Sequence, residues 1–167
     1  MALDPKSSQR ERAQRPGTVI GIVVSRFHED LTGAMLVSAQ RELAASGVEA
    51  ADVHVAWVPG AFELPIAAKR MSDHPEIDAV ICLALVLKGE TEHDYFVAHG
   101  ATIGLVQTSL AQDTPIHFGV LTCATLEQAR ARALPPELGG REDKGRAVAR
   151  AAIDTLVALD EIEELNP

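Results

Sequence analysis

Short apolar runs alternate with stretches of helical periodicity along most of this chain. The runs are rich in valine, isoleucine and leucine at consecutive positions, which is typical of strands buried on both faces. The stretches between them space their apolar residues three or four positions apart, as amphipathic helices do. The predicted strands are residues 18–25, 53–58, 79–87 and 116–122, and the predicted helices are 30–46, 62–71, 95–111, a short helix opening at Thr125, and 144–159.

This order of elements predicts the fold class. Strands that are apolar on both faces need helices on both faces, and parallel strands need crossover connections. We therefore expect an α/β protein with a doubly wound, flavodoxin-like, four-stranded parallel sheet. Residues 18–160 would form one domain.

The two ends of the chain break the pattern. Residues 1–17 are polar, with four basic and two acidic side chains, and are predicted to form a disordered tail. A transit peptide is the alternative reading of this segment. Residues 161–167 are predicted to form a short acidic tail.

Composition narrows the possible partners. At 167 residues and 17.8 kDa, the length fits one domain with a substantial core. A formal charge of −9 argues against nucleic acid or an anionic membrane as a partner. Neither a transmembrane span nor a secretory signal is visible, and Cys82 and Cys123 lie in or beside apolar runs. We therefore predict reduced core thiols and a cytoplasmic location.

Chemically versatile side chains follow three of the predicted strands. Phe27 and His28 follow the first, Phe62 and Glu63 follow the second, and the loop KGETEHD (88–94) follows the third. Doubly wound folds bind ligands outside the carboxyl ends of their strands. These three loops are therefore expected to converge on a ligand.

Each residue also has a purely structural interpretation. The phenylalanines could be core plugs, Glu63 could face the helix dipole, and His93 could be a solvated loop residue. His28 and His93 could bind a metal, but no H-E-x-x-H or C-x-x-C spacing accompanies them. We predict no metal.

The 88–94 loop favours an anion. Gly89 allows close backbone approach, and the following helix presents free N–H groups. A neighbouring histidine could move protons near neutral pH. Neither the P-loop pattern nor G-x-G-x-x-G occurs, so a single phosphate is favoured over a nucleotide. Arg132 could grip that phosphate, or it could simply face a helix C-terminus.

Taken together, these motifs resemble the 6,7-dimethyl-8-ribityllumazine synthase family of riboflavin biosynthesis. The resemblance rests on SRFHED, AWVPGAFELP, VLKGETEHD, FGVLTCATLEQARARA and EDKG, in order, between about residues 18 and 159. It implies that a ribitylamino-pyrimidinedione amine condenses with 3,4-dihydroxy-2-butanone 4-phosphate. An imine would form, phosphate would leave, and the ring would close with loss of water, without any cofactor.

The resemblance also implies roles for individual residues. His93 would transfer protons. The pyrimidine and its ribityl chain would be bound by Phe27, Ala61, Phe62, Glu63, Leu85, Val86, Leu87, Phe118 and Lys144. Phosphate would be bound by Glu90, Thr91 and Arg132. The family builds its site between neighbouring subunits of a homo-oligomer, a pentamer or stacked decamer, and Phe118 would serve a neighbour's site.

Some positions depart from the family's usual pattern. Many members have asparagine at the position of His28 and arginine at that of Lys88, and the Glu90 carboxylate must point away from the anion. Three alternatives stand beside the enzyme. One is a lumazine- or flavin-binding relative that has lost catalysis, and another is a shell-forming protein. The third is an unrelated flavodoxin-like carrier, which the anion site and the histidine disfavour.

Overall fold

The computed structural model describes residues 13–165 and contains one four-stranded sheet. All neighbouring strands are parallel, in the order β2-β1-β3-β4. This order is that of a flavodoxin-like doubly wound sheet and confirms the predicted fold class. The strands are β1 (Ile20–Ser25), β2 (Val53–Val58), β3 (Ala79–Leu87) and β4 (Ile116–Cys123).

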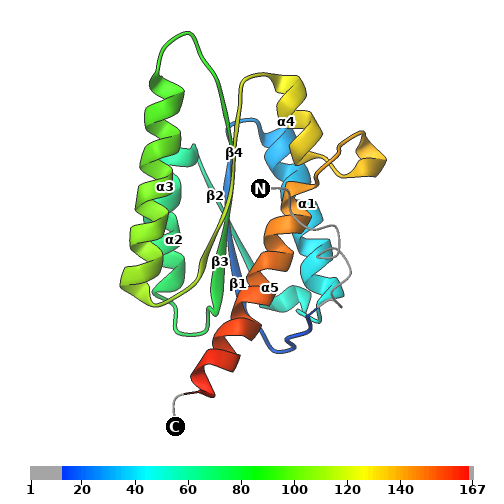
Figure 1. Cartoon of the computed structure of the whole chain (residues 1–167), viewed down its shortest axis with the longest axis vertical. Coiled ribbons are helices and arrows are strands. Elements are labelled where there is room, and N and C mark those ends of the chain that lie inside the picture. Colours follow the sequence, from blue (N-terminus) through cyan, green and yellow to red (C-terminus); the bar gives the residue numbers. More distant parts are fainter. Residues whose placement is uncertain (1–12, 166–167) are drawn as a thin grey trace.

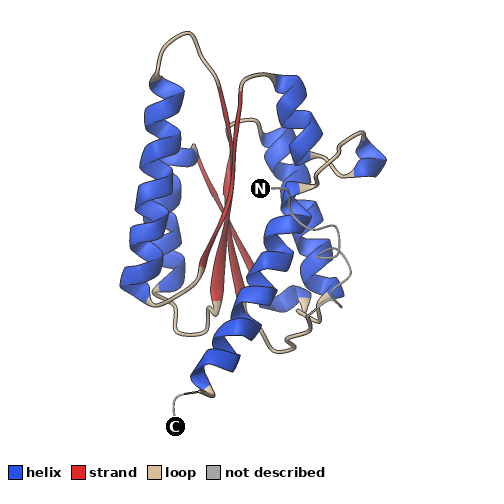
Figure 2. Cartoon of the chain, in the orientation of Figure 1, coloured by secondary structure: helices blue, strands red, loops and turns tan. Residues whose placement is uncertain are grey.

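Helices cover both faces of the sheet. Figure 1 shows α2 and α3 against one face and α1, α4 and α5 against the other, and Figure 2 shows the strands enclosed between the two helical layers. The helices are α1 (Glu29–Ala45), α2 (Leu64–Ser72), α3 (His93–Gln112), α4 (Leu126–Ala133) and α5 (Lys144–Glu163), with 3₁₀ turns at Ala50–Asp52, Ala61–Glu63 and Pro136–Leu138.

The core is divided by the sheet into two clusters. Along β3, Ile81 and Leu83 lie in the cluster under α1 and α5, whereas Val80 and Cys82 lie in the cluster under α2 and α3. Consecutive positions of this strand are thus apolar because both of its faces are buried. Cys82 and Cys123 are both buried free thiols, as predicted.

Side-chain acceptors bond backbone N–H groups at the start of several elements, two of which begin away from their predicted places. β1 begins at Ile20 and not at residue 18, because the Val19 N–H donates to the Asp78 carboxylate (2.8 Å). α3 begins two residues early, at His93, where the Thr91 hydroxyl oxygen accepts the His93 N–H (3.3 Å). Thr125 caps α4 as predicted, since its hydroxyl oxygen accepts the Gln128 N–H (3.2 Å).

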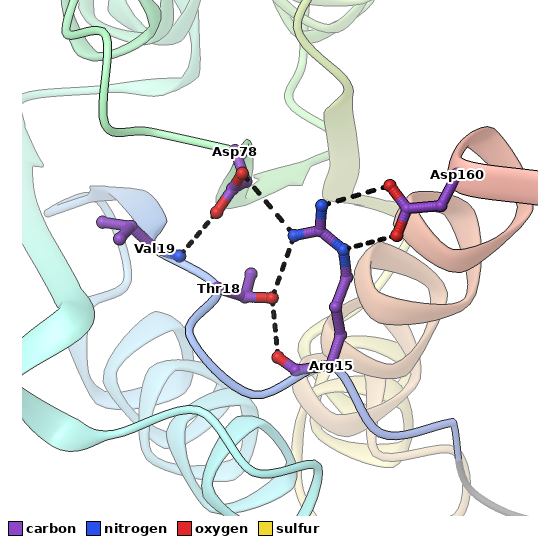
Figure 3. A network of polar contacts seen from close by, with 5 residues as sticks. All are labelled: Arg15, Thr18, Val19, Asp78 and Asp160. Carbon is purple, nitrogen blue, oxygen red and sulfur yellow. Dashed lines mark hydrogen bonds and ion pairs between the residues drawn. The ribbon is translucent and has the colours of Figure 1, made fainter. Parts of the chain in front are cut away.

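The segment before β1 is held to the folded domain by Arg15 (Figure 3). Its guanidinium donates to the Thr18 hydroxyl at 3.1 Å and to the Asp160 carboxylate at 2.8 Å, and it lies 3.5 Å from Asp78. The predicted disordered tail therefore extends too far, because residues 13–17 include this anchored arginine. Residues 1–12 lie outside the described part of the chain.

The other predicted tail also begins later than expected. α5 continues to Glu163, four residues beyond its predicted end. The Arg15 guanidinium meets Asp160 in this last part of the helix and holds the pKa of that carboxyl below its usual range. Residues 166 and 167 lie outside the described range.

His117 on the edge strand β4 makes stability depend on pH. Its register partner is Ile81, which belongs to the cluster under α1 and α5, and its buried Nε2 has no hydrogen-bond partner in the described structure. Burial lowers the pKa of His117 to about 4. An imidazole that is neutral when folded and protonated when unfolded destabilises the fold as the pH falls below about 6.5.

We expect His117→Leu to remove this dependence. Between pH 6.5 and 4 the wild type should lose roughly 3 kcal/mol more of its unfolding free energy than the variant does. Urea unfolding at several pH values measures the difference. His54→Leu is the matched control, since His54 is exposed on the other edge strand, β2. Parallel pH profiles for wild type and His117→Leu would contradict the assignment.

Candidate active site

A cavity of about 580 Å³ opens at the carboxyl ends of the strands. It lies where the chain order of the sheet reverses between β1 and β3, which is the ligand-binding position of doubly wound folds. The lining residues are Phe27, Gly60, Ala61, Phe62, Glu63, Leu85, Val86, Leu87, Gly89, Thr91, His93, Asp94, Phe96 and Val97. The three loops that follow β1, β2 and β3 therefore converge, as the sequence predicted.

The loop after β1 presents an exposed aromatic ring. The Ser25 hydroxyl oxygen accepts the Phe27 N–H at 3.2 Å, so the chain turns sharply at the end of the strand. The Phe27 side chain is 66% exposed and lines the cavity. A core plug would be buried, so the structural interpretation of this residue is wrong.

The loop after β2 supplies a second ring and a carboxylate. The 3₁₀ turn Ala61–Glu63 buries Ala61 and leaves Phe62 61% exposed beside the cavity. Gly100 of α3 makes room for that ring, because a Cβ there would lie 2.8 Å from the Phe62 ring. Glu63 is partly buried at the end of this turn.

The loop after β3 is organised by Asp94. This carboxylate accepts the Gly89 N–H at 3.3 Å and lies 3.5 Å from the Lys88 ammonium. Partial burial opposes ionisation, but these two partners outweigh it and hold the pKa of Asp94 below its usual range. The loop is thus fixed by a carboxylate, while Thr91 at its end and His93, the first residue of α3, line the cavity.

The exposed first turn of α3 is suited to an anion. His93 is the first residue of the helix, and the backbone N–H groups of this first turn have no carbonyl partners within the helix. Thr91 and the exposed His93 both line the cavity beside these N–H groups. The site can therefore bind an anion beside a group able to donate or accept protons.

Four predicted site residues lie outside the cavity lining. Phe118 is on the edge strand β4, 39% exposed, and Lys144 is the first residue of α5. Arg132 lies on α4, where its guanidinium donates to the Gln128 carbonyl at 3.2 Å and approaches Glu142 at 3.6 Å. Glu90 is exposed in the 88–94 loop without lining the cavity.

Apart from the glycines Gly60 and Gly89, three lining residues were not assigned to the site from the sequence. Phe96 and Val97 follow His93 by three and four positions, and Asp94 follows it directly. Residues three and four apart share one helix face, so extending the helix start to His93 would have placed Phe96 and Val97 at the cavity. Asp94 gave no such signal, because its partners Lys88 and Gly89 depend on how the loop folds.

The described residues contain neither a metal-ligand cluster nor a membrane-spanning helix. Between residues 13 and 165, no three histidine, cysteine, aspartate or glutamate side chains are grouped so that they could hold a metal ion. Across the same range, no helix has the length and apolar character needed to cross a membrane.

Comparison with known proteins identifies the family. The sequence pattern of 6,7-dimethyl-8-ribityllumazine synthase matches residues 17–160. The chain belongs to the lumazine synthase family. Residues 17–160 include all the predicted site residues, from Phe27 to Lys144.

Several curated relatives carry the name 6,7-dimethyl-8-ribityllumazine synthase. The relative from Thermus thermophilus is 43% identical over 147 residues, which is 87% of this chain and 90% of the relative. The relative from Lactiplantibacillus plantarum is 48% identical over 117 residues, covering 70% and 74% of the two chains. The Protochlamydia amoebophila relative is 40% identical over 147 residues, covering 88% and 83%. The similarity to lumazine synthases thus spans most of each chain.

Proposed function

We propose that the cavity is where this lumazine synthase family member condenses 5-amino-6-(D-ribitylamino)uracil with 3,4-dihydroxy-2-butanone 4-phosphate. The product is 6,7-dimethyl-8-ribityllumazine, with release of phosphate and water. The observation that carries the proposal is the convergence of two exposed aromatic rings, a carboxylate and a histidine-bearing anion loop in one cavity. These groups match what the two substrates carry, which is a flat ring and a polyol chain on one and a phosphate on the other.

The pyrimidine half of the site is apolar with a polar edge. Phe27 stacks on the pyrimidine, and Phe62 packs against the same substrate. Glu63 accepts hydrogen bonds from ribityl hydroxyl groups. Ala61 keeps this wall close to the ligand, and the peptide groups of residues 85–87, at the end of β3, bond the ring edge.

The phosphate half uses backbone N–H groups. Those of Glu90 and Thr91, with the Thr91 hydroxyl, surround the phosphate while the Glu90 carboxylate points away. Arg132 adds a bidentate grip. His93, beside this site, moves the protons that imine formation and ring closure require. Holding two reactive substrates together supplies most of the remaining acceleration.

Product formation tests this function directly. Purified protein mixed with both substrates should develop lumazine absorbance and release phosphate in equal molar amounts. Omitting either substrate should abolish both signals. Ligand binding without turnover would instead favour the flavin- or lumazine-binding alternative.

We further propose that the site is completed by a second copy of the chain. Arg132, Phe118 and Lys144 lie outside the cavity lining of their own chain, and Phe118 is exposed on an edge strand. α3 also carries exposed apolar residues on one face, namely Ile103, Val106 and Leu110. Head-to-tail contacts between copies that close into a ring would bury such a face. They would also give each cavity side chains from a neighbouring subunit.

We expect a ring of five subunits, or two stacked rings, and not a sixty-subunit cage. The turn Pro136–Leu138 projects beyond α4 in Figure 1, and Glu137 ties it to Arg41 of α1 at 3.5 Å. A projecting turn at this corner should obstruct contacts between rings. Sedimentation velocity at moderate concentration measures the mass, and a species of sixty subunits or hollow particles in micrographs would contradict this expectation.

We also place the enzyme in the cytoplasm. Its two thiols, Cys82 and Cys123, are buried and unpaired, which suits a reducing compartment.

A further inference from the structure

Among residues 13–165, the ring of Phe27 meets one other aromatic ring, that of the adjacent His28. The two ring centroids are 5.0 Å apart and the planes are inclined at 89°, so the rings meet edge to face. Phe27 lines the cavity and is 66% exposed, whereas His28 is only partly exposed and does not line the cavity. The imidazole therefore lies beside the ring without forming part of the cavity wall.

The backbone that places the imidazole there is unusual for histidine. His28 has φ 59° and ψ 50°, in the left-handed region, and it precedes the first residue of α1. Its carbonyl oxygen accepts the N–H groups of Leu31 (2.9 Å) and Thr32 (3.0 Å), which fixes this conformation. The Thr32 hydroxyl also donates to the Ser25 carbonyl at 2.7 Å, so the turn is braced from both ends. Glycine or asparagine would adopt this conformation with less strain than histidine.

We propose that His28 is a positioning residue that holds the Phe27 ring in the orientation in which it stacks on the pyrimidine. This inference rests on the proposed function and deepens it. An exposed phenylalanine side chain rotates among rotamers, and a ligand that stacks on it must select one of them. An edge-to-face contact favours one orientation before the ligand arrives, so less conformational entropy is lost on binding.

Two variants separate the ring contact from the backbone turn. His28→Gly and His28→Asn both remove the imidazole and both tolerate the left-handed conformation. We expect each to weaken binding of 6,7-dimethyl-8-ribityllumazine by about 3- to 10-fold, the range of an aromatic pair. The KM of the pyrimidine substrate should rise by a similar factor. The kcat and the KM of the butanone phosphate should stay within about twofold, since neither involves the ring orientation.

A double-mutant cycle shows whether His28 acts through Phe27. In a Phe27→Ala background, removing the imidazole should have no further effect on lumazine affinity, because there is no ring to position. The melting temperature should not fall in His28→Gly, since glycine relieves the left-handed backbone. Lower stability with unchanged affinity would mean that His28 serves only the fold.

The possible outcomes are distinct. The inference is overturned, while the proposed function stands, if both His28 variants bind lumazine as tightly as the wild type. It is also overturned if removing the imidazole lowers lumazine affinity as much in the Phe27→Ala background as in the wild type. A wild-type protein that neither binds nor forms lumazine overturns the proposed function and the inference with it. His74→Asn, at an exposed site after α2, controls for removal of a histidine.

Discussion

Replacing Arg132 with alanine should raise the KM of the butanone phosphate about 100-fold, and the KM of the pyrimidine by no more than about twofold. Only one substrate carries a phosphate, and losing a hydrogen-bonded charge pair of this kind removes about 2–3 kcal/mol. In the described structure the Arg132 guanidinium donates to the Gln128 carbonyl at 3.2 Å and approaches Glu142 at 3.6 Å, so it must turn from these partners to bind phosphate. Steady-state kinetics with each substrate varied in turn measure the two effects separately.

Two further variants sharpen the result. Arg132→Lys should recover only part of the loss, because an ammonium group cannot grip a phosphate through two parallel N–H groups. Arg130→Ala, two positions earlier on the same helix and exposed, should leave both KM values unchanged. Equal losses for the two substrates in Arg132→Ala would show that the residue supports the fold and does not bind phosphate.

His93→Ala should lower kcat roughly tenfold and leave the affinity for both substrates almost unchanged. General acid–base groups contribute typically about 10²–10⁴ to a rate, but both substrates here are already reactive, so we expect a smaller loss. Binding should persist because the aromatic rings and the backbone N–H groups of the anion loop remain. Stopped-flow lumazine absorbance measures turnover, and equilibrium titration measures binding.

The pH profile distinguishes proton transfer from a packing effect. Wild-type turnover should depend on pH more strongly than that of His93→Ala, because the variant lacks the side chain that transfers protons. His74→Ala, outside the cavity, should retain the wild-type profile. The same profile for wild type and His93→Ala, together with equal rates, would remove His93 from the mechanism.

The fold could be predicted because the local pattern of apolar and polar residues determines which segments form buried strands and which form helices. β3 is apolar at every position since both of its faces are buried, and such a run followed by a helical stretch has few other interpretations. Boundaries were less predictable, because they depend on partners distant in sequence. The Val19 N–H is taken by Asp78, which lies 59 residues away, so the first strand begins later than its composition indicates.

The site could be predicted in part for a similar reason. Phe27, Glu63 and His93 follow strands whose carboxyl ends must meet at one edge of a parallel sheet, so their convergence follows from topology. The pairing of Arg132 with Glu142 could not be foreseen, because the irregular segment between them has no periodicity to read. The role of Asp94 was not predicted, because no sequence pattern marks it. Its hydrogen bond with the Gly89 N–H depends on the path of the backbone in the loop.

The Arg15 anchor has a practical consequence for protein engineering. It joins residue 15 to Asp160, so the segment before β1 lies beside the last part of α5. Its other partners, Thr18 and Asp78, precede β1 and β3, which places this junction at the amino ends of the strands and the cavity at the opposite edge. A reporter domain fused at residue 13 or at residue 165 would therefore leave the mouth of the cavity open. A circular permutant could join the segment before β1 to the end of α5 with a linker and open the chain at the projecting 136–138 turn.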